Sequence, residues 1–518
     1  MIIDSRQVEN GATLEADICI IGSGPAGISL AAEFLGTAID VCILESGGEQ
    51  PDAETQLLAG GLSTGHRYFS LMSTRLRMFG GTSGHWTGWC RPLDRIDFEA
   101  RPWIPYSGWP LEFDELTEFY DRAQTVCDLG PYGYKLSDWL PAGNDHLLKE
   151  SAGLDAKVIQ FSPPTRFGPK YKRQIEESTN VIACLHANVT QINASPTGTE
   201  VESVSVATLT GRNFHVKAKT VVLAAGGLES PRLLLMSDSI QKEGLGNGKD
   251  VVGRYFMNHT FLPVGFVVGS HLAEGDSSFV QFQGVHQQSG GPARVQAYLA
   301  VSPEVQARER IANVSFNLVP TDLSTLIYGS DDNATWFEKL GLTIRNFDEV
   351  FLGAANRAYA RFNPDKLQPV YSILSITEQT PNPASRVTLV SERDALGQRL
   401  LNLEWRLSDI DFFSWKRSHV IIGAELARAG SGRIVSDVME RDAWPDGYIG
   451  DWHHMGTTRM SDSDREGVVD RNCRVHGISN LYIAGSSVFP TSGYANPTLT
   501  IVALSLRLAD HLKRERNG

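Results

Sequence analysis

Residues 17–27 read DICIIGSGPAG, and this segment is the strongest indication of the fold of the chain. Its first five residues form a short apolar run, which predicts a buried strand ending at a glycine-rich turn. A helical stretch continues to Phe34, and a second apolar run from Val41 to Leu44 ends in the acid Glu45. A strand, a glycine turn, a helix and a strand ending in an acid are typical of a dinucleotide-binding unit.

Each part of this unit has a chemical purpose. Glycine lets the backbone approach a pyrophosphate, a helix N-terminus binds its negative charge, and a carboxylate accepts from ribose hydroxyls. We therefore assign cofactor binding to Gly22, Gly24, Ala26, Gly27 and Glu45. The alternative is a tight strand–helix turn followed by a solvated glutamate.

The last seventy residues suggest the chemistry. Residues 452–457 read WHHMGT, a buried strand is predicted over 481–484, and Asn496-Pro497 predicts a helix start followed by a helix over 498–512. The positive end of that helix points toward Asn496. His453, Asn496 and a helix N-terminus together suit removal of a proton from a hydroxyl and binding of an anion. Asn496 could instead serve only as the helix cap.

The cofactor-binding signals are not contiguous along the chain. A buried strand is predicted over 220–224, followed by a helix capped by Ser230 and starting at Pro231. A short strand over 187–192 is expected beside an adenine. The predicted fold class is α/β, a doubly wound, Rossmann-like cofactor domain built from 1–112, 181–262 and 450–518.

The intervening stretches, 113–180 and 263–449, are assigned to an α+β substrate-binding domain. Residues 113–180 are expected to form an insertion over the cofactor, and 321–363 to be helical. A hairpin turn is expected at Asp394 to Gly397, between the last two strands. The strand-like runs that predict an antiparallel sheet are 264–269, 295–301, 370–377, 387–390 and 400–405.

Bulk composition narrows the function classes. A formal net charge of −13 over 518 residues argues against nucleic-acid binding. No apolar run reaches the roughly 18 residues of a membrane helix, and the first 17 residues carry five charged side chains, unlike a signal peptide. The six cysteines form no CxxC pair, so neither a metal nor a disulfide framework is expected. We expect a cytoplasmic protein without membrane insertion.

Taken together, these motifs resemble the glucose–methanol–choline (GMC) family of FAD-dependent oxidoreductases. The resemblance runs from the N-terminus to the last helix and includes GGTSGHW at 80–86, AGGLESP at 225–231 and EQTPNP at 378–383. Its most specific element is the terminal His-x-x-Gly-Thr with Asn-Pro-Thr. Within the family, the terminal segment and Ser-Gly-His-Trp-Thr are most similar to pyranose oxidase and related bacterial sugar dehydrogenases.

The resemblance implies FAD as cofactor and hydride transfer from a CH–OH group of a sugar, glycoside or related polyol to flavin N5. It makes His453 the catalytic base and Asn496 its hydrogen-bonding partner. Oxygen or a quinone-like acceptor would reoxidise the flavin, and the chain is compatible with a homo-oligomer. The remaining flavin contacts that the resemblance implies are Gly81, Thr82, Ser83, His85, Trp86, Thr87, Val189, Ala225, Gly226, Gly485, Ser486, Asn496, Pro497 and Thr498.

Three alternatives stay open at this point. His85 either forms a covalent bond to the flavin, as in the pyranose oxidase branch, or only contacts it. His454 is interpreted as structural, although the sequence also allows a catalytic role. The N-terminal fingerprint also suits an FAD-dependent monooxygenase or reductase that uses NAD(P)H.

The substrate is expected to be carbohydrate-like because 281–288 carries several glutamines and a histidine.

Overall fold

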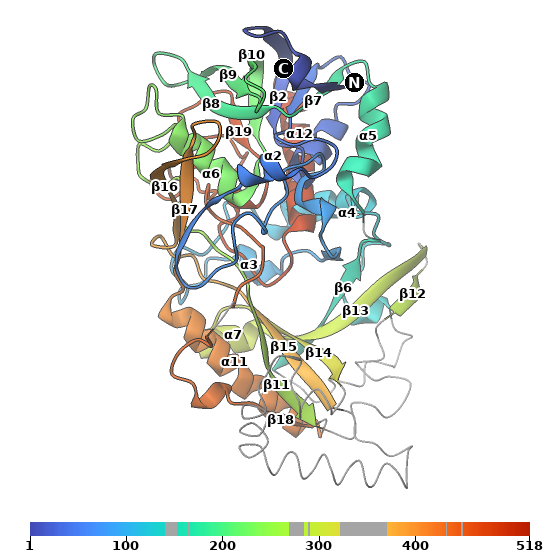
Figure 1. The fold of residues 1–518 in the computed structure, drawn as a ribbon. Helices are drawn as coiled ribbons and strands as arrows, with labels where there is room; N and C mark the ends of the chain where they lie inside the picture. The colour runs from blue at the N-terminus through green and yellow to red at the C-terminus, as the bar shows by residue number, and fades with distance from the viewer. Residues whose placement is uncertain are drawn as a thin grey trace.

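A computed structural model describes residues 1–139, 153–163, 165–268, 284–288, 291–321, 370–430, 432–446 and 449–517. In Figure 1, one layered body contains both termini, and a second body with its own sheet lies below it. The described helices are α1 (Pro25–Ala32), α2 (Ala53–Leu57), α3 (Arg95–Phe98), α4 (Thr117–Val126), α5 (Phe167–Glu177), α6 (Gly226–Met236), α7 (Pro303–Glu309), α11 (Asp409–Arg428) and α12 (Thr498–Asn517).

The first sheet has the strand order β1-β7-β3-β2-β10-β9-β8, and β19 pairs with β10. All its strands come from 1–112, 181–262 and 450–518. Their bounds are β1 (Ile2–Asp4), β2 (Thr13–Ile21), β3 (Val41–Leu44), β7 (Val181–Leu185), β8 (Asn188–Ala194), β9 (Val201–Ala207), β10 (Asn213–Leu223) and β19 (Leu481–Ile483).

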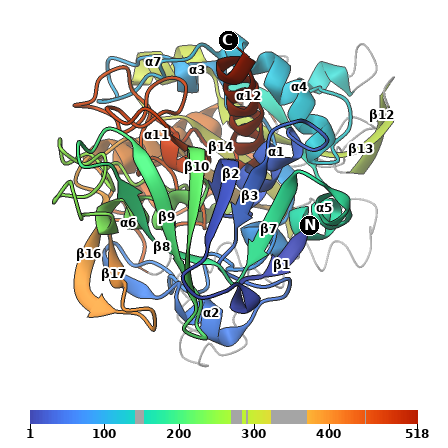
Figure 2. The same ribbon diagram turned by 90° about the horizontal axis from the view of Figure 1, so that it is seen from above.

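Parallel pairing at the centre of this sheet produces the doubly wound arrangement. β2 pairs in parallel with β3 on one side and with β10 on the other, and β19 extends β10 in parallel. Residues 18–21 and 41–44 are buried, as expected for strands covered on both faces. In Figure 2, α1, α4 and α12 lie together on one side of these strands. The predicted α/β fold class is therefore confirmed.

The second sheet is antiparallel in every described strand pair and has the order β18-β11-β15-β14-β13-β6-β5, with β12 on β13. It confirms the expected antiparallel sheet for the described parts of three predicted runs, 264–268, 295–301 and 370–377. Its strands are β5 (Trp89–Cys90), β6 (Leu154–Phe161), β11 (Thr260–Val268), β12 (Gly284–Gln288), β13 (Gly291–Val301), β14 (Val314–Thr321), β15 (Val370–Thr377) and β18 (Arg433–Val435). Most of the helix expected over 321–363 lies outside the described residues, as do Gln281 and Gln283.

The last two predicted strands do not join that sheet. β16 (Arg386–Arg393) and β17 (Arg399–Trp405) form the expected hairpin, but they pair with β4 (Gly61–Gly65) in a separate three-stranded sheet. The apolar residues of β16 and β17 still pack into the core of the second body. The hairpin is therefore placed by burial of these side chains, while β4 pairs with the free edge of β17. The prediction of a single substrate sheet was wrong here.

The insertion 113–180 is divided between the two bodies. Buried residues of α4 and α5 belong to the core of the first sheet, whereas β6 belongs to the second. We therefore propose that the cofactor domain includes α4 and α5 besides 1–112, 181–262 and 450–518, and that β6 and 263–449 form the substrate domain.

Helix α6 starts earlier than predicted. It begins at Gly226, Pro231 lies inside it, and the hydroxyl of Ser230 is buried without a partner among the described residues, so Ser230 is not the cap. Proline lacks the N–H that would bond to the carbonyl of Gly227. The hydroxyl of Thr457 donates to that carbonyl at 2.6 Å instead. The terminal His-x-x-Gly-Thr motif therefore completes a helix that lies far earlier in the chain.

Candidate active site

A cavity of about 670 Å³ lies where the two bodies meet. The carboxyl ends of β2, β3 and β10 open into it, the usual ligand position in doubly wound sheets. Phe261 of β11 and Ile376 of β15 line it from the second sheet. The sequence-predicted site residues that line it are Gly22, Gly24, Ala26, Glu45, Gly81, Thr82, Ser83, His85, Trp86, Thr87, Val189, Ala225, Gly226, His453, Gly485, Ser486, Asn496, Pro497 and Thr498.

Among the described residues, Gly27 is the one predicted FAD-contact residue that does not line the cavity. A Cβ at position 27 would lie 2.0 Å from the carbonyl oxygen of Gly22. Gly27 therefore lets α1 approach the end of β2. Gly22 itself has φ +107°, and a Cβ there would lie 2.6 Å from the carbonyl oxygen of Ala224. These two glycines shape the turn, and Gly24 faces the cavity.

The N-terminus of α1 is prepared to bind an anion. Its cap residue is Gly24, and no side chain caps the helix. The free N–H groups and the helix dipole therefore favour negative charge at the cavity wall. This is the position predicted for the pyrophosphate.

Glu45 lines the cavity at the end of β3 but is already engaged. Its carboxylate accepts from the backbone N–H of Ser23 at 3.1 Å, from the Ser23 hydroxyl at 2.6 Å and from the N–H of Gly47 at 2.9 Å. Burial raises the pKa of Glu45, and these hydrogen bonds oppose that rise. Glu45 thus joins the turn to the strand, with lone pairs left to accept from ribose hydroxyls.

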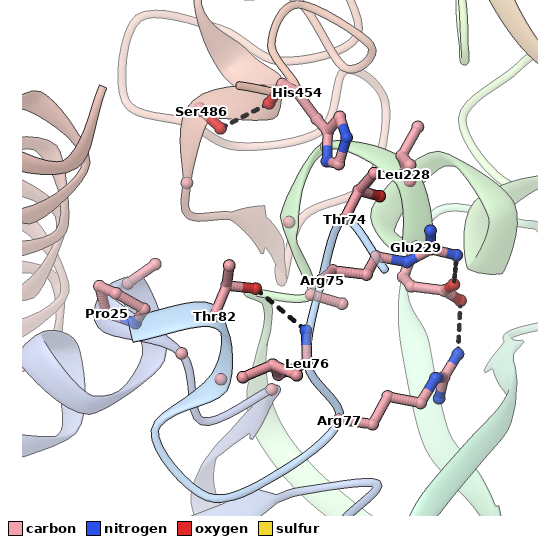
Figure 3. Close-up of a pocket in the computed structure, with 18 of the residues that line it drawn as sticks. Pro25, Thr74, Arg75, Leu76, Arg77, Thr82, Leu228, Glu229, His454 and Ser486 are labelled. Carbon is pink, nitrogen blue, oxygen red and sulfur yellow. Dashed lines mark hydrogen bonds and ion pairs between the residues drawn. The ribbon is translucent and has the colours of Figure 1, made fainter. Parts of the chain in front are cut away.

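A charge cluster not anticipated from the sequence also lines the cavity. Figure 3 shows Glu229 of α6 between the guanidinium groups of Arg75 and Arg77, at N–O distances of 2.6 and 2.9 Å. Arg232 joins Glu229 to Asp394 of the β16–β17 hairpin. Burial alone would raise the pKa of Glu229, but the three arginines lower it below its usual range. The motif at 225–231 contains Glu229 but did not predict the cluster, because Arg75, Arg77 and Asp394 come from other segments of the chain.

His453 and Asn496 meet at the other end of the cavity. The Nε2 atom of His453 lies 3.2 Å from the amide nitrogen of Asn496, and the His453 side chain is 17% exposed. The prediction that Asn496 starts the helix is one residue off, because α12 begins at Thr498 and the Pro497 carbonyl accepts its first backbone bond, from Ile501. The structure therefore supports the contact with His453 rather than the cap.

The adjacent His454 also lines the cavity, but its ring makes different contacts from that of His453. His454 is buried, and its Nε2 lies 2.9 Å from the hydroxyl of Tyr68, which donates to the backbone carbonyl of Asp451. Burial and the Arg75 guanidinium lower the pKa of His454 well below its usual range. These contacts support the structural interpretation of His454.

His85 lies against Trp452, with ring centroids 5.2 Å apart. Its Nε2 is buried and has no hydrogen-bond partner among the described residues. Burial, and then the charge of Arg166, lower the pKa of His85. A neutral imidazole therefore lines the cavity, with its Nε2 covered by protein atoms.

Sequence reasoning missed His259, which is fully buried directly behind His453. Its Nδ1 atom lies 3.0 Å from Nδ1 of His453. The available signal was the polar pair Asn258-His259 between Met257 and the start of a strand, where a buried core would favour apolar side chains.

Within the described ranges, neither a membrane-spanning helix nor a metal-binding cluster is found. No helix there is both long and apolar enough to cross a membrane. No group of three His, Cys, Asp or Glu side chains there could hold a metal ion.

Comparison with known proteins agrees with this geometry. Residues 17–242 match the FAD dependent oxidoreductase family model, and 381–505 match the GMC oxidoreductase model. The chain therefore contains a GMC oxidoreductase C-terminal domain and an FAD oxidoreductase domain. It is an enzyme with FAD as cofactor, and it oxidises an alcohol- or sugar-type substrate.

Three relatives illustrate the range of the family. A 2-methyl-1,2-propanediol dehydrogenase of Mycolicibacterium austroafricanum is 22% identical over 96% of this chain and 95% of its own. A choline oxidase of Arthrobacter globiformis is 23% identical over 99% and 96%. A C-glycoside 3-oxidase of Microbacterium trichothecenolyticum is 25% identical over 84% and 75%. Among solved structures, formate oxidase superposes with a TM-score of 0.58 at 16% identity, covering 98% of this chain and 100% of that one.

Proposed function

We propose that His453 is the general base of this enzyme and that Asn496 is its hydrogen-bonding partner. The observation that carries the proposal is the 3.2 Å contact between His453 Nε2 and the Asn496 amide at the wall of the cavity. Both residues fall inside the segment that matches the GMC model. A substrate hydroxyl between them would give its proton to the imidazole, while the amide holds the oxygen.

FAD, when bound, supplies the hydride acceptor for the CH–OH carbon. The chain's own residues bind and orient the reactants. The N-terminus of α1 and Glu45 suit the pyrophosphate and the ribose, and the N-terminus of α12 at Pro497 and Thr498 suits an anion near the reacting centre. Phe261, Ile376 and Trp452 line the cavity and limit the water inside it.

We propose a carbohydrate-like substrate. The names of two relatives support it, a C-glycoside 3-oxidase and the large subunit of a fructose dehydrogenase of Gluconobacter japonicus, the latter 27% identical over 58% of this chain and 48% of its own. Anaerobic bleaching of the bound flavin by sugars, glycosides, aminoglycosides, sterols and alkanols tests the substrate class. Turnover confined to sterols or alkanols would refute it.

The same enzyme, once its flavin has been reduced, can be used to identify the electron acceptor. Mixing the reduced enzyme with air or with a quinone shows which of the two reoxidises the flavin. The NAD(P)H-dependent alternative predicts anaerobic bleaching by NADPH, whereas we expect no bleaching because the matches place the chain among enzymes that act on alcohols.

The base is tested with His453→Ala. We expect FAD to stay bound and the rate of flavin reduction to fall by about a hundredfold or more, the usual contribution of a general base. His454→Gln is the matched control, because His454 is adjacent but bonds to Tyr68. That control should lower stability and leave the pH dependence of flavin reduction unchanged. Flavin reduction by His453→Ala at the wild-type rate would show that the base is another group.

A further inference from the structure

A second buried histidine is held rigidly against His453. The segment around His259 pairs with the segment around His453 through two backbone hydrogen bonds between Met257 and Met455, both 3.0 Å long. The side-chain oxygen of Asn258 accepts from the backbone N–H of His259 at 2.9 Å and from that of His453 at 3.3 Å. Both rings are therefore attached to one hydrogen-bonded framework.

The ring proton of His259 is determined by what surrounds the ring. Its Nε2 faces the carbonyl oxygen of Ser492 at 3.4 Å, and a carbonyl can only accept. The proton therefore lies on Nε2. Burial, and then the neighbouring His453, lower the pKa of His259 to about 3, so the ring carries no second proton near neutrality. Its Nδ1 is left with a lone pair and can only accept.

This assignment determines the tautomer of His453. Its Nδ1 lies 3.0 Å from the accepting Nδ1 of His259 and 3.6 Å from a carboxylate oxygen of Asp451. Both neighbours are acceptors, so the proton of His453 lies on Nδ1. Its Nε2 then carries the lone pair and faces the amide donor of Asn496. His453 also contributes to the lowered pKa of His454. His454 Nε2 is hydrogen-bonded to Tyr68 instead.

We propose that His259 is a positioning residue, which accepts the Nδ1 proton of His453 and so aims the basic Nε2 at the substrate hydroxyl. The proposal rests on the assignment of His453 as the base. When His453 takes up the hydroxyl proton on Nε2, its Nδ1–H bond to His259 is kept. His259 cannot relay a proton onward, because its only other ring nitrogen already bears a proton toward Ser492. The nearby carboxylate of Asp451 stabilises the imidazolium.

The tautomer can be observed directly in the FAD-loaded wild-type enzyme. Selective ¹⁵N labelling of histidine, with His453→Ala used to assign its signals, distinguishes a protonated Nδ1 from a protonated Nε2. We expect the Nδ1–H form at neutral pH. Observation of the Nε2–H form would overturn the proposal, and this measurement needs no variant at position 259.

Two substitutions then test the contact. His259→Phe removes the acceptor, whereas the side-chain oxygen of His259→Asn can occupy the position of Nδ1. For His259→Phe we expect a mixed tautomer of His453 and a flavin reduction rate lower by about tenfold to a hundredfold, as for partners that orient metal-bound histidines. The substrate concentration for half-saturation should change little, and His259→Asn should recover most of the rate and the Nδ1–H signal.

The outcomes separate the proposal from its premise. If His259→Phe keeps both the wild-type rate and the Nδ1–H tautomer, the positioning role is wrong while His453 remains the base. If Asp451→Ala shifts the tautomer and His259→Phe does not, Asp451 is the orienting group and the proposal is likewise overturned. If His453→Ala reduces flavin normally, the assignment of the base fails, whatever tautomer the labelled histidine shows.

Discussion

The change Gly27→Ala tests how the first turn is built. A Cβ at position 27 would lie 2.0 Å from the carbonyl oxygen of Gly22 and 3.2 Å from Ile20 Cγ2, whereas ordinary contact begins at 3.4 Å. The carbonyl belongs to the backbone and cannot rotate away, so α1 must move from β2 until the 2.0 Å approach opens to 3.4 Å. Overpacking of this kind costs about 1–3 kcal/mol, and we expect the upper end for the flavin-free protein.

The same displacement should weaken FAD binding. A shift of this size takes the N–H groups at the start of α1 out of hydrogen-bonding range of a pyrophosphate, and hydrogen bonds to charged groups contribute about 1.5–3 kcal/mol each. The loss of a single bond corresponds to a weakening of FAD binding by about tenfold to a hundredfold. Urea unfolding of the flavin-free protein and titration with FAD measure the two effects separately.

Gly24→Ala is the matched control. Gly24 has φ −69°, and a Cβ there meets no protein atom within 4 Å. We expect the free energy of unfolding of the flavin-free protein to change by less than about 1 kcal/mol, while FAD binding weakens because the methyl group enters the cavity. Wild-type stability of Gly27→Ala, or equal destabilisation by both changes, would refute this division of roles.

Three further predictions concern other buried groups. Glu45→Ala should both weaken FAD retention and lower the free energy of unfolding, because it leaves the N–H groups of Ser23 and Gly47 without acceptors. Flavin content and urea unfolding measure the two effects. Unchanged flavin content would count against the ribose contact. His85 lines the cavity, and the resemblance to the pyranose oxidase branch motivates a covalent flavin bond at this residue. Acid precipitation should then leave a yellow pellet, and a yellow supernatant with a colourless pellet would exclude the bond. Burial lowers the pKa of His419 to about 4 in the folded protein. As the pH falls below about 6.5, this histidine is protonated in the unfolded chain but not yet in the folded one. The free energy of unfolding therefore falls by up to about 1.4 kcal/mol per pH unit until about pH 4. His419→Gln should flatten that acid limb in urea unfolding between pH 7 and 5, and an unchanged slope would contradict the assignment.

Local patterns were sufficient wherever neighbours in sequence are neighbours in space. The run from Ile18 to Ile21, the glycine turn and the acid Glu45 predicted a strand, a turn and a second strand that the structure contains. The hairpin over 386–405 was also predictable from its alternation and its turn at Asp394. Its partner strand β4 was not, because the pairing of strands so far apart in the chain leaves no local signal.

The class of fold, the cofactor unit and the pair His453 and Asn496 were predictable from the amino-acid sequence alone, because each depends on a short pattern with its own backbone chemistry. Two contacts are visible only in the folded chain: Thr457 completes the helix containing Pro231, and His259 lies behind His453. Both contacts join segments that are distant in the chain, and each satisfies a buried polar group whose need for a partner is evident only once packing has excluded water.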